Sequence, residues 1–218
     1  MRIGLFGGTF DPIHNGHLRA ALDACEDFPL DQCVLIPAAK PPHKNGLKTA
    51  GVDHRLAMTR LAAEGIDKLA VSDVETQRTG PSFTIDTIRH FRRTLAAADE
   101  LLLMLGADAF FEIDTWHSWQ ELLDEVGLLV MTRPGGATAD FAVAIDAFIS
   151  GHLADGYTFD WNRKGFFHRE RPPIFYVPVT QLDISSTDIR RRIHRGRSVR
   201  FLLPESVARY IDREELYR

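Results

Sequence analysis

The sequence predicts an α/β fold: a doubly wound parallel sheet with a small C-terminal helical part. Three observations support this fold class. Short apolar segments alternate with helical segments along the chain. The apolar segments are nearly continuous in apolar character, as in strands buried on both faces. Several of the loops that follow them are rich in glycine and polar residues, and such sheets bind ligands at the carboxyl ends of their strands.

Six segments are predicted as strands because they are short, apolar and bounded by turn residues. They are residues 2–6, 33–36, 69–72, 101–105, 127–131 and 174–177. Helical spacing predicts helices between them at residues 16–27, 52–64, 84–97 and 140–153. Two more are expected at 184–195 and at 204–213, where Pro204 suits a first turn. Residues 155–173 are irregular and aromatic, and fit no element; a surface excursion and a subunit contact both suit them.

The composition is that of an ordinary folded protein. With 218 residues, 44% of them hydrophobic, the chain suits one domain over residues 1–218, with residues 184–218 as its C-terminal helical portion. A net charge of -4 gives no reason to expect nucleic acid as a partner. The two cysteines, Cys25 and Cys33, form no CxxC pattern, and no apolar run is long enough to span a membrane. We expect a cytoplasmic protein without membrane attachment, as a monomer or a homo-oligomer.

The first loop, residues 7–17, has the sequence GGTFDPIHNGH and follows the first predicted strand. Its glycines let the backbone approach a ligand, and Asn15 is expected to cap a helix whose N–H groups favour an anion. His14 and His17 are three residues apart, so both can face the same phosphate. A histidine metal site and ordinary capping or core histidines are the alternatives. Nothing nearby supplies further metal ligands, so we predict a phosphate site.

This loop resembles the HxGH loop of the adenylyltransferase branch of the nucleotidylyltransferase superfamily, in which the two histidines contact the ATP phosphates. The resemblance implies a Rossmann-like nucleotidyltransferase fold. The residues of this loop that it assigns to ATP are Gly7, Gly8, Thr9, Phe10, His14 and His17.

A second motif, ISSTDIR, occupies residues 184–190. Ser185 or Ser186 can cap the helix that it opens, and a guanidinium at Arg190 can bind phosphate oxygens in a fork. A capped surface helix is the simpler interpretation, but the string resembles the ISSTxIR signature of the same superfamily, which holds the β- and γ-phosphates. The implied ATP-binding residues are Ile184, Ser185, Ser186, Thr187 and Arg190. The arginines that follow are more typical of a solvated helix face than of a nucleic-acid site.

Three further elements resemble the nicotinate-nucleotide adenylyltransferases. The loop PAAKPPHK implies that Lys40 and His43 form a cationic arm that binds substrate. The element PSFT, with phenylalanine in place of the usual tyrosine, implies that the N–H of Thr84 binds the nicotinate carboxylate. This likeness covers residues 1–218 and is weakest across 155–173.

The third element, a GxD turn, implies that Gly106 and Asp108 contact the nucleotide, while Trp116 stacks on the pyridine ring. Glu112 departs from the family pattern, in which several members carry an aromatic residue. A carboxylate there would repel an acidic substrate if it faced the pocket.

These motifs predict an ATP-dependent nucleotidyltransferase that moves AMP onto nicotinate mononucleotide and releases pyrophosphate. The expected catalytic residues are His14, His17, Lys40 and Arg190. Mg²⁺ is the expected cofactor, held mainly by the ATP phosphates, with no protein metal site. Two alternatives stay open: an adenylyltransferase for nicotinamide mononucleotide or phosphopantetheine, and a non-catalytic nucleotide sensor.

Overall fold

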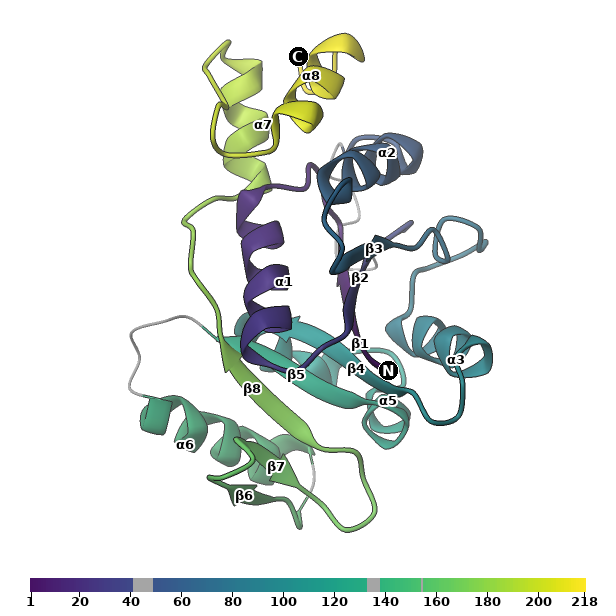
Figure 1. The fold of residues 1–218 in the computed structure, drawn as a ribbon, viewed down its shortest axis with the longest axis vertical. Coiled ribbons are helices and arrows are strands. Elements are labelled where there is room, and N and C mark those ends of the chain that lie inside the picture. The colour runs from purple at the N-terminus through teal and green to yellow at the C-terminus, as the bar shows by residue number, and fades with distance from the viewer. Residues whose placement is uncertain (41–48, 133–137, 154) are drawn as a thin grey trace.

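A computed structural model describes residues 1–40, 49–132, 138–153 and 155–218 (Figure 1). It contains one eight-stranded sheet in the order β3-β2-β1-β4-β5-β8-β7-β6. The six predicted strands are present and pair in parallel with one another: β1 Arg2–Gly8, β2 Gln32–Pro37, β3 Leu69–Val71, β4 Glu100–Gly106, β5 Gly127–Thr132 and β8 Ile174–Pro178. The strand order reverses between β1 and β4, so the predicted fold class is confirmed.

Helices cover both faces of the sheet, and neighbouring residues of one strand therefore enter different cores. In β4, Leu103 packs into one core and Met104 into the other. The core of Leu103 includes residues from α3 Thr84–Thr94, α5 Trp119–Glu125 and α6 Thr138–Phe148. The core of Met104 includes residues from α1 Asn15–Asp27, α2 Val52–Ala63, α7 Ser186–His194 and α8 Glu205–Arg213. In Figure 1, α7 and α8 lie together at the same end of the molecule as α2. None of the described helices is long and apolar enough to cross a membrane.

Residues 155–173, unassigned from the sequence, contribute a hairpin to the sheet. Its strands, β6 Thr158–Asp160 and β7 Gly165–Phe167, are antiparallel, and β7 pairs with β8. Three-residue strands are too short to show a period, which is why the pattern gave no signal. A Cβ on Gly165 would lie 2.7 Å from the Phe175 ring, so this close approach favours glycine.

The connection from β4 to β5 also differs from the prediction. Residues 106–116, where no helix was predicted, contain α4 Ala107–Phe110 and a short 3-10 turn, η2 Ile113–Thr115, and α5 follows them. Elements this short fall below the window in which apolar residues reveal helical spacing. The helix expected over residues 140–153 is divided into α6 and a π-helical turn, η3 Ile149–Leu153.

Candidate functional site

Two cavities open beside the carboxyl ends of β1 and β4, where the strand order reverses. The larger, of about 490 Å³, is lined by Gly7, Gly8 and Leu105 together with the start of α3. The smaller, of about 290 Å³, is lined by residues that include His14, His17 and Asp108. Parallel α/β sheets bind their ligands at such a switch point, so the two cavities define the candidate site.

The residue that caps α1 is His14, which corrects the expectation that Asn15 would do so. His14 has extended backbone (φ -146°, ψ 170°), and Asn15 is the first residue of the helix. The Asn15 amide instead donates to the Phe201 carbonyl at 2.8 Å, and its backbone N–H donates to the Leu202 carbonyl at 3.0 Å. Phe201 and Leu202, 186 and 187 positions away, thus hold both the side chain and the backbone N–H of Asn15, and no local pattern reveals these contacts.

The two histidine rings stack with 3.7 Å between their centroids. The backbone N–H of His14 donates to Nδ1 of His17 at 3.3 Å, so a neutral His17 carries its proton on Nε2. Phe10, 2% exposed, packs edge-on against the His17 ring at 5.1 Å. It lies beneath the loop rather than lining either cavity, so its side chain supports His17. A Cβ on Gly16 would lie 3.1 Å from the His14 ring, which favours glycine between the histidines.

Burial lowers the pKa of the His14 imidazole from 6.5 to about 4, so the ring is neutral at pH 7. The unfolded chain takes up this proton below pH 6.5 and the folded chain only near pH 4, so stability should fall as the pH decreases through that range. At about pH 4.5 the loss should be on the order of 2–3 kcal/mol. Urea unfolding of the wild type and of His14→Gln at pH 7 and pH 4.5 measures it. Parallel pH profiles for the two proteins would contradict the prediction.

The ISSTDIR helix packs directly on the first loop. Arg190 on α7 donates from Nη1 to the Asp11 carbonyl at 2.6 Å and from Nη2 to Thr187 Oγ1 at 3.2 Å. Ser186 Oγ donates to the Pro12 carbonyl at 2.9 Å. Ser185, not Ser186, is the N-cap, because its Oγ accepts the Asp188 N–H at 3.1 Å. The two motifs, far apart in sequence, therefore form one surface at the end of β1.

Arg55 on α2 joins the loops around this surface, and no sequence motif pointed to it. The side chain is 2% exposed and donates to four carbonyls: Thr9 at 2.7 Å, Ala38 at 2.6 Å, and Ala39 and Ala50 at 3.1 Å each. Burial lowers the pKa of its guanidinium, and the Asp11 carboxylate opposes this shift. Arginine in a helix sequence is usually read as a surface residue, which is why it was missed.

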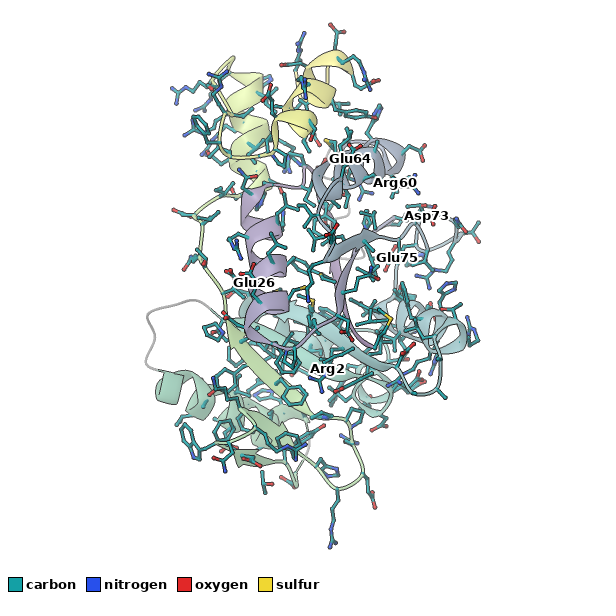
Figure 2. All side chains as sticks on the ribbon, viewed as in Figure 1. Arg2, Glu26, Arg60, Glu64, Asp73 and Glu75 are labelled. Atoms are coloured by element: carbon teal, nitrogen blue, oxygen red, sulfur yellow. The ribbon has the colours of Figure 1, made fainter. Side chains whose placement is uncertain are left out.

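We expect Arg55→Met to lower the free energy of unfolding by about 3–5 kcal/mol, because four partly buried carbonyls lose the buried guanidinium that donates to them. Chemical denaturation measures the loss. Arg60→Met is the matched control, since Arg60 lies on the same helix but makes a half-exposed ion pair with Asp73 at 3.0 Å (Figure 2). Equal effects of the two substitutions would show that the carbonyl contacts of Arg55 contribute little.

The larger cavity is lined by aromatic side chains and by the start of a helix. Thr84 opens α3 and lines the cavity, as does Trp116 on the opposite segment. Phe83 stacks on His117 with 4.1 Å between centroids, and both rings line it too. His117 was not foreseen, because a histidine beside a tryptophan in a loop carries no periodic signal.

The segment after β2 reaches this cavity through its backbone. Lys40 N–H donates to Ser82 Oγ at 3.1 Å, and Ser82 N–H donates to the Lys40 carbonyl at 3.1 Å. The Lys40 side chain is exposed and does not line either cavity. His43 lies outside the described residues, so its predicted role is not tested.

Glu112 is exposed and does not line the larger cavity, so its carboxylate would not repel an acidic substrate bound there. The acid that does border the cavity is Glu75, on the segment between β3 and α3 (Figure 2). Thr87 donates to its Oε1 at 2.8 Å, and Arg78 Nη2 lies 3.9 Å from the same oxygen. Arg78 offsets part of this charge, and the other carboxylate oxygen, Glu75 Oε2, is buried without a hydrogen-bond partner within the described residues.

Of the remaining predicted residues, two line the smaller cavity and three do not. Gly106 and Asp108 both line it, and Asp108 lies in the first turn of α4. Ile184 packs against the core of α1 and α2, while Ser185 and Thr187 are exposed on α7.

Comparison with known proteins agrees with this geometry. Residues 5–192 match the family model described as cytidylyltransferase-like. A probable nicotinate-nucleotide adenylyltransferase of Pseudomonas fluorescens is 42% identical over 217 residues, covering 100% of this chain and 97% of that protein. One of Geobacter metallireducens, also described as probable, is 39% identical, with 100% and 98% covered.

Among solved structures, the nicotinic acid mononucleotide adenylyltransferase of Plasmodium falciparum, in complex with NaAD, has the same fold. The TM-score is 0.70 over 99% of this chain and 97% of that one, at 16% identity. The family is assigned from the full-length sequence identity to the bacterial proteins and not from this likeness of fold. The chain belongs to the nicotinate-nucleotide adenylyltransferase family, within the cytidylyltransferase-like proteins.

Proposed function

We propose that this protein transfers the adenylyl group of ATP to nicotinate mononucleotide, giving nicotinate adenine dinucleotide and pyrophosphate, in NAD biosynthesis. The observation that carries the proposal is the pair of cavities that both lie beside the end of β1, with His14 and His17 in one and Thr84 and Trp116 in the other. A transfer between two nucleotides needs two adjacent sites with the reacting phosphates between them. The bacterial relatives, which match this chain over nearly their full length, are named as probable enzymes of this activity.

In the proposed reaction, a phosphate oxygen of the mononucleotide attacks the α-phosphorus of ATP in line. The new O–Pα bond forms as the bond from Pα to the bridging oxygen breaks, and that oxygen leaves with pyrophosphate. The acceptor brings its own anionic nucleophile, so the protein's part is positioning and charge stabilisation.

Each predicted residue has a role in this scheme. His14 and His17 stabilise charge on the α-phosphate and the leaving group, and Lys40 and Arg190 balance the outer phosphates. Asp108 holds the adenosine part from the smaller cavity, whose lining it joins. Thr84 and Trp116 hold the nicotinate ring in the larger one.

The donor set around the phosphates is suited to phosphate rather than to a hard cation. It consists of imidazoles, a guanidinium and backbone N–H groups, and within the described residues no three His, Cys, Asp or Glu side chains gather as metal ligands. We therefore propose that Mg²⁺ is held by ATP phosphate oxygens and water. When bound, it neutralises phosphate charge.

We also propose a cytoplasmic location, since Cys25 and Cys33 are free thiols.

One assay tests the proposed function. Pyrophosphate release is measured with ATP and nicotinate mononucleotide, and in parallel with nicotinamide mononucleotide and phosphopantetheine. Release that depends on nicotinate mononucleotide supports the proposal. ATP binding in calorimetry without pyrophosphate release from any acceptor would identify a nucleotide sensor instead.

A further inference from the structure

Asp11, within the first loop, lies at the centre of a buried polar network that the reaction scheme does not use. It is 2% exposed, and its Oδ1 accepts the Ala50 N–H at 3.1 Å. Its Oδ2 lies 3.4 Å from Nη1 of Arg190, the same nitrogen that donates to the Asp11 carbonyl. The position of Arg190, and so of its remaining donors, depends on how Asp11 is held.

The remaining contact to Asp11 comes from far along the chain. Tyr217, which follows α8, donates its hydroxyl to Asp11 Oδ1 at 2.6 Å across 206 residues of sequence. Burial and this hydrogen bond raise the pKa of the Tyr217 hydroxyl, so it keeps its proton and acts as the donor. A carboxylate that accepts two hydrogen bonds on Oδ1 has less unbalanced charge with which to draw Arg190.

The backbone around Tyr217 is strained in a way that serves this contact. Glu215 and Tyr217 have φ values of +52° and +67°, in the left-handed region that side chains other than glycine seldom adopt. The Leu216 N–H donates to the Ile211 carbonyl at 3.0 Å, which turns the segment back at the end of α8. Strain of this kind persists where surrounding contacts compensate for it, and the Asp11 hydrogen bond is such a contact.

We propose that Tyr217 is a positioning residue for the ATP site: by holding Asp11, it keeps the Arg190 guanidinium directed at the outer phosphates. Two of the five guanidinium donors are used by the Asp11 carbonyl and Thr187, which leaves others for phosphate. Without the tyrosine hydroxyl, Asp11 draws Arg190 into a closer ion pair, and that pair competes with the phosphates. The inference rests on the proposed binding of ATP phosphates by Arg190.

The test is Tyr217→Phe, which removes only the hydroxyl. We expect its Kd for ATP in calorimetry to rise about 3- to 10-fold, because one charge-assisted hydrogen bond is lost. The KM for nicotinate mononucleotide should not change, since Arg190, through which Tyr217 acts, is assigned to the outer phosphates of ATP and not to the acceptor. Tyr210→Phe is the matched control: its hydroxyl contacts His54 at 2.9 Å on α2, outside this network. ATP affinity should be unchanged in that variant.

A double mutant separates positioning from a general loss of structure. In an Arg190→Ala background, Tyr217→Phe should weaken ATP no further, because the tyrosine acts through the arginine. An ATP Kd unchanged by Tyr217→Phe, or an equal loss in both backgrounds, would overturn the proposal. These outcomes are distinct from failure of the proposed function, in which the wild type itself releases no pyrophosphate.

Discussion

Replacing His17 with alanine is expected to lower kcat by about 10²–10³-fold, the usual loss for one donor that stabilises the transition state. His17 lines the smaller cavity, and its ring is held by the stack on His14 and the edge of Phe10. A side chain fixed before the substrate arrives has little reorganisation to undergo as charge develops, so its removal should affect turnover most.

Single-turnover and steady-state pyrophosphate release measure this effect. His194→Ala is a suitable control, because His194 is an exposed histidine at the end of α7 that lines neither cavity. Both variants should unfold near the wild-type midpoint. A near-normal kcat in well-folded His17→Ala would exclude the role assigned to this residue.

The second large effect concerns the acceptor: kcat/KM for nicotinate mononucleotide should exceed that for nicotinamide mononucleotide by about 10² or more. Thr84 places the start of α3 on the cavity wall, and N–H groups at a helix start suit both oxygens of a carboxylate. An amide would direct its NH₂ group at one of these donors. Glu112 does not line this cavity; Glu75 does, and Arg78, 3.9 Å from its carboxylate, offsets part of the charge that would oppose an acidic substrate.

Side-by-side kinetics with the two mononucleotides test the preference. Trp116→Ala provides an internal control, since stacking on a flat pyridinium ring does not distinguish acid from amide. It should lower kcat/KM for both acceptors and leave their ratio unchanged. Equal values in the wild type, or a preference for the amide, would refute the acid-specific assignment and leave adenylyl transfer intact.

Part of the site could be predicted because its signals are local. The strand ends, the glycines of the first loop, the spacing of His14 and His17, and the capped start of α7 each lie within a few consecutive residues. The nearly continuous apolar character of the buried strands also predicted the doubly wound sheet, since a strand such as β4 is apolar at nearly every position only when both faces are covered.

Other features depend on contacts between distant residues. His14 rather than Asn15 caps α1 because the Asn15 amide reaches Phe201. The surface at the end of β1 is assembled by Arg55 and by the Arg190–Asp11 contact, each of which satisfies backbone or carboxylate groups that a sequence pattern does not display.

By itself, then, the sequence determined the fold class and the family resemblance and located the two loop motifs, because each is expressed in periodicity or in short strings. The tertiary structure decided which buried polar groups pair, that Glu75 rather than Glu112 borders the larger cavity, and that Tyr217 contacts Asp11. The physical reason is that a buried donor or acceptor must be satisfied, while the partner that satisfies it can come from anywhere in the chain.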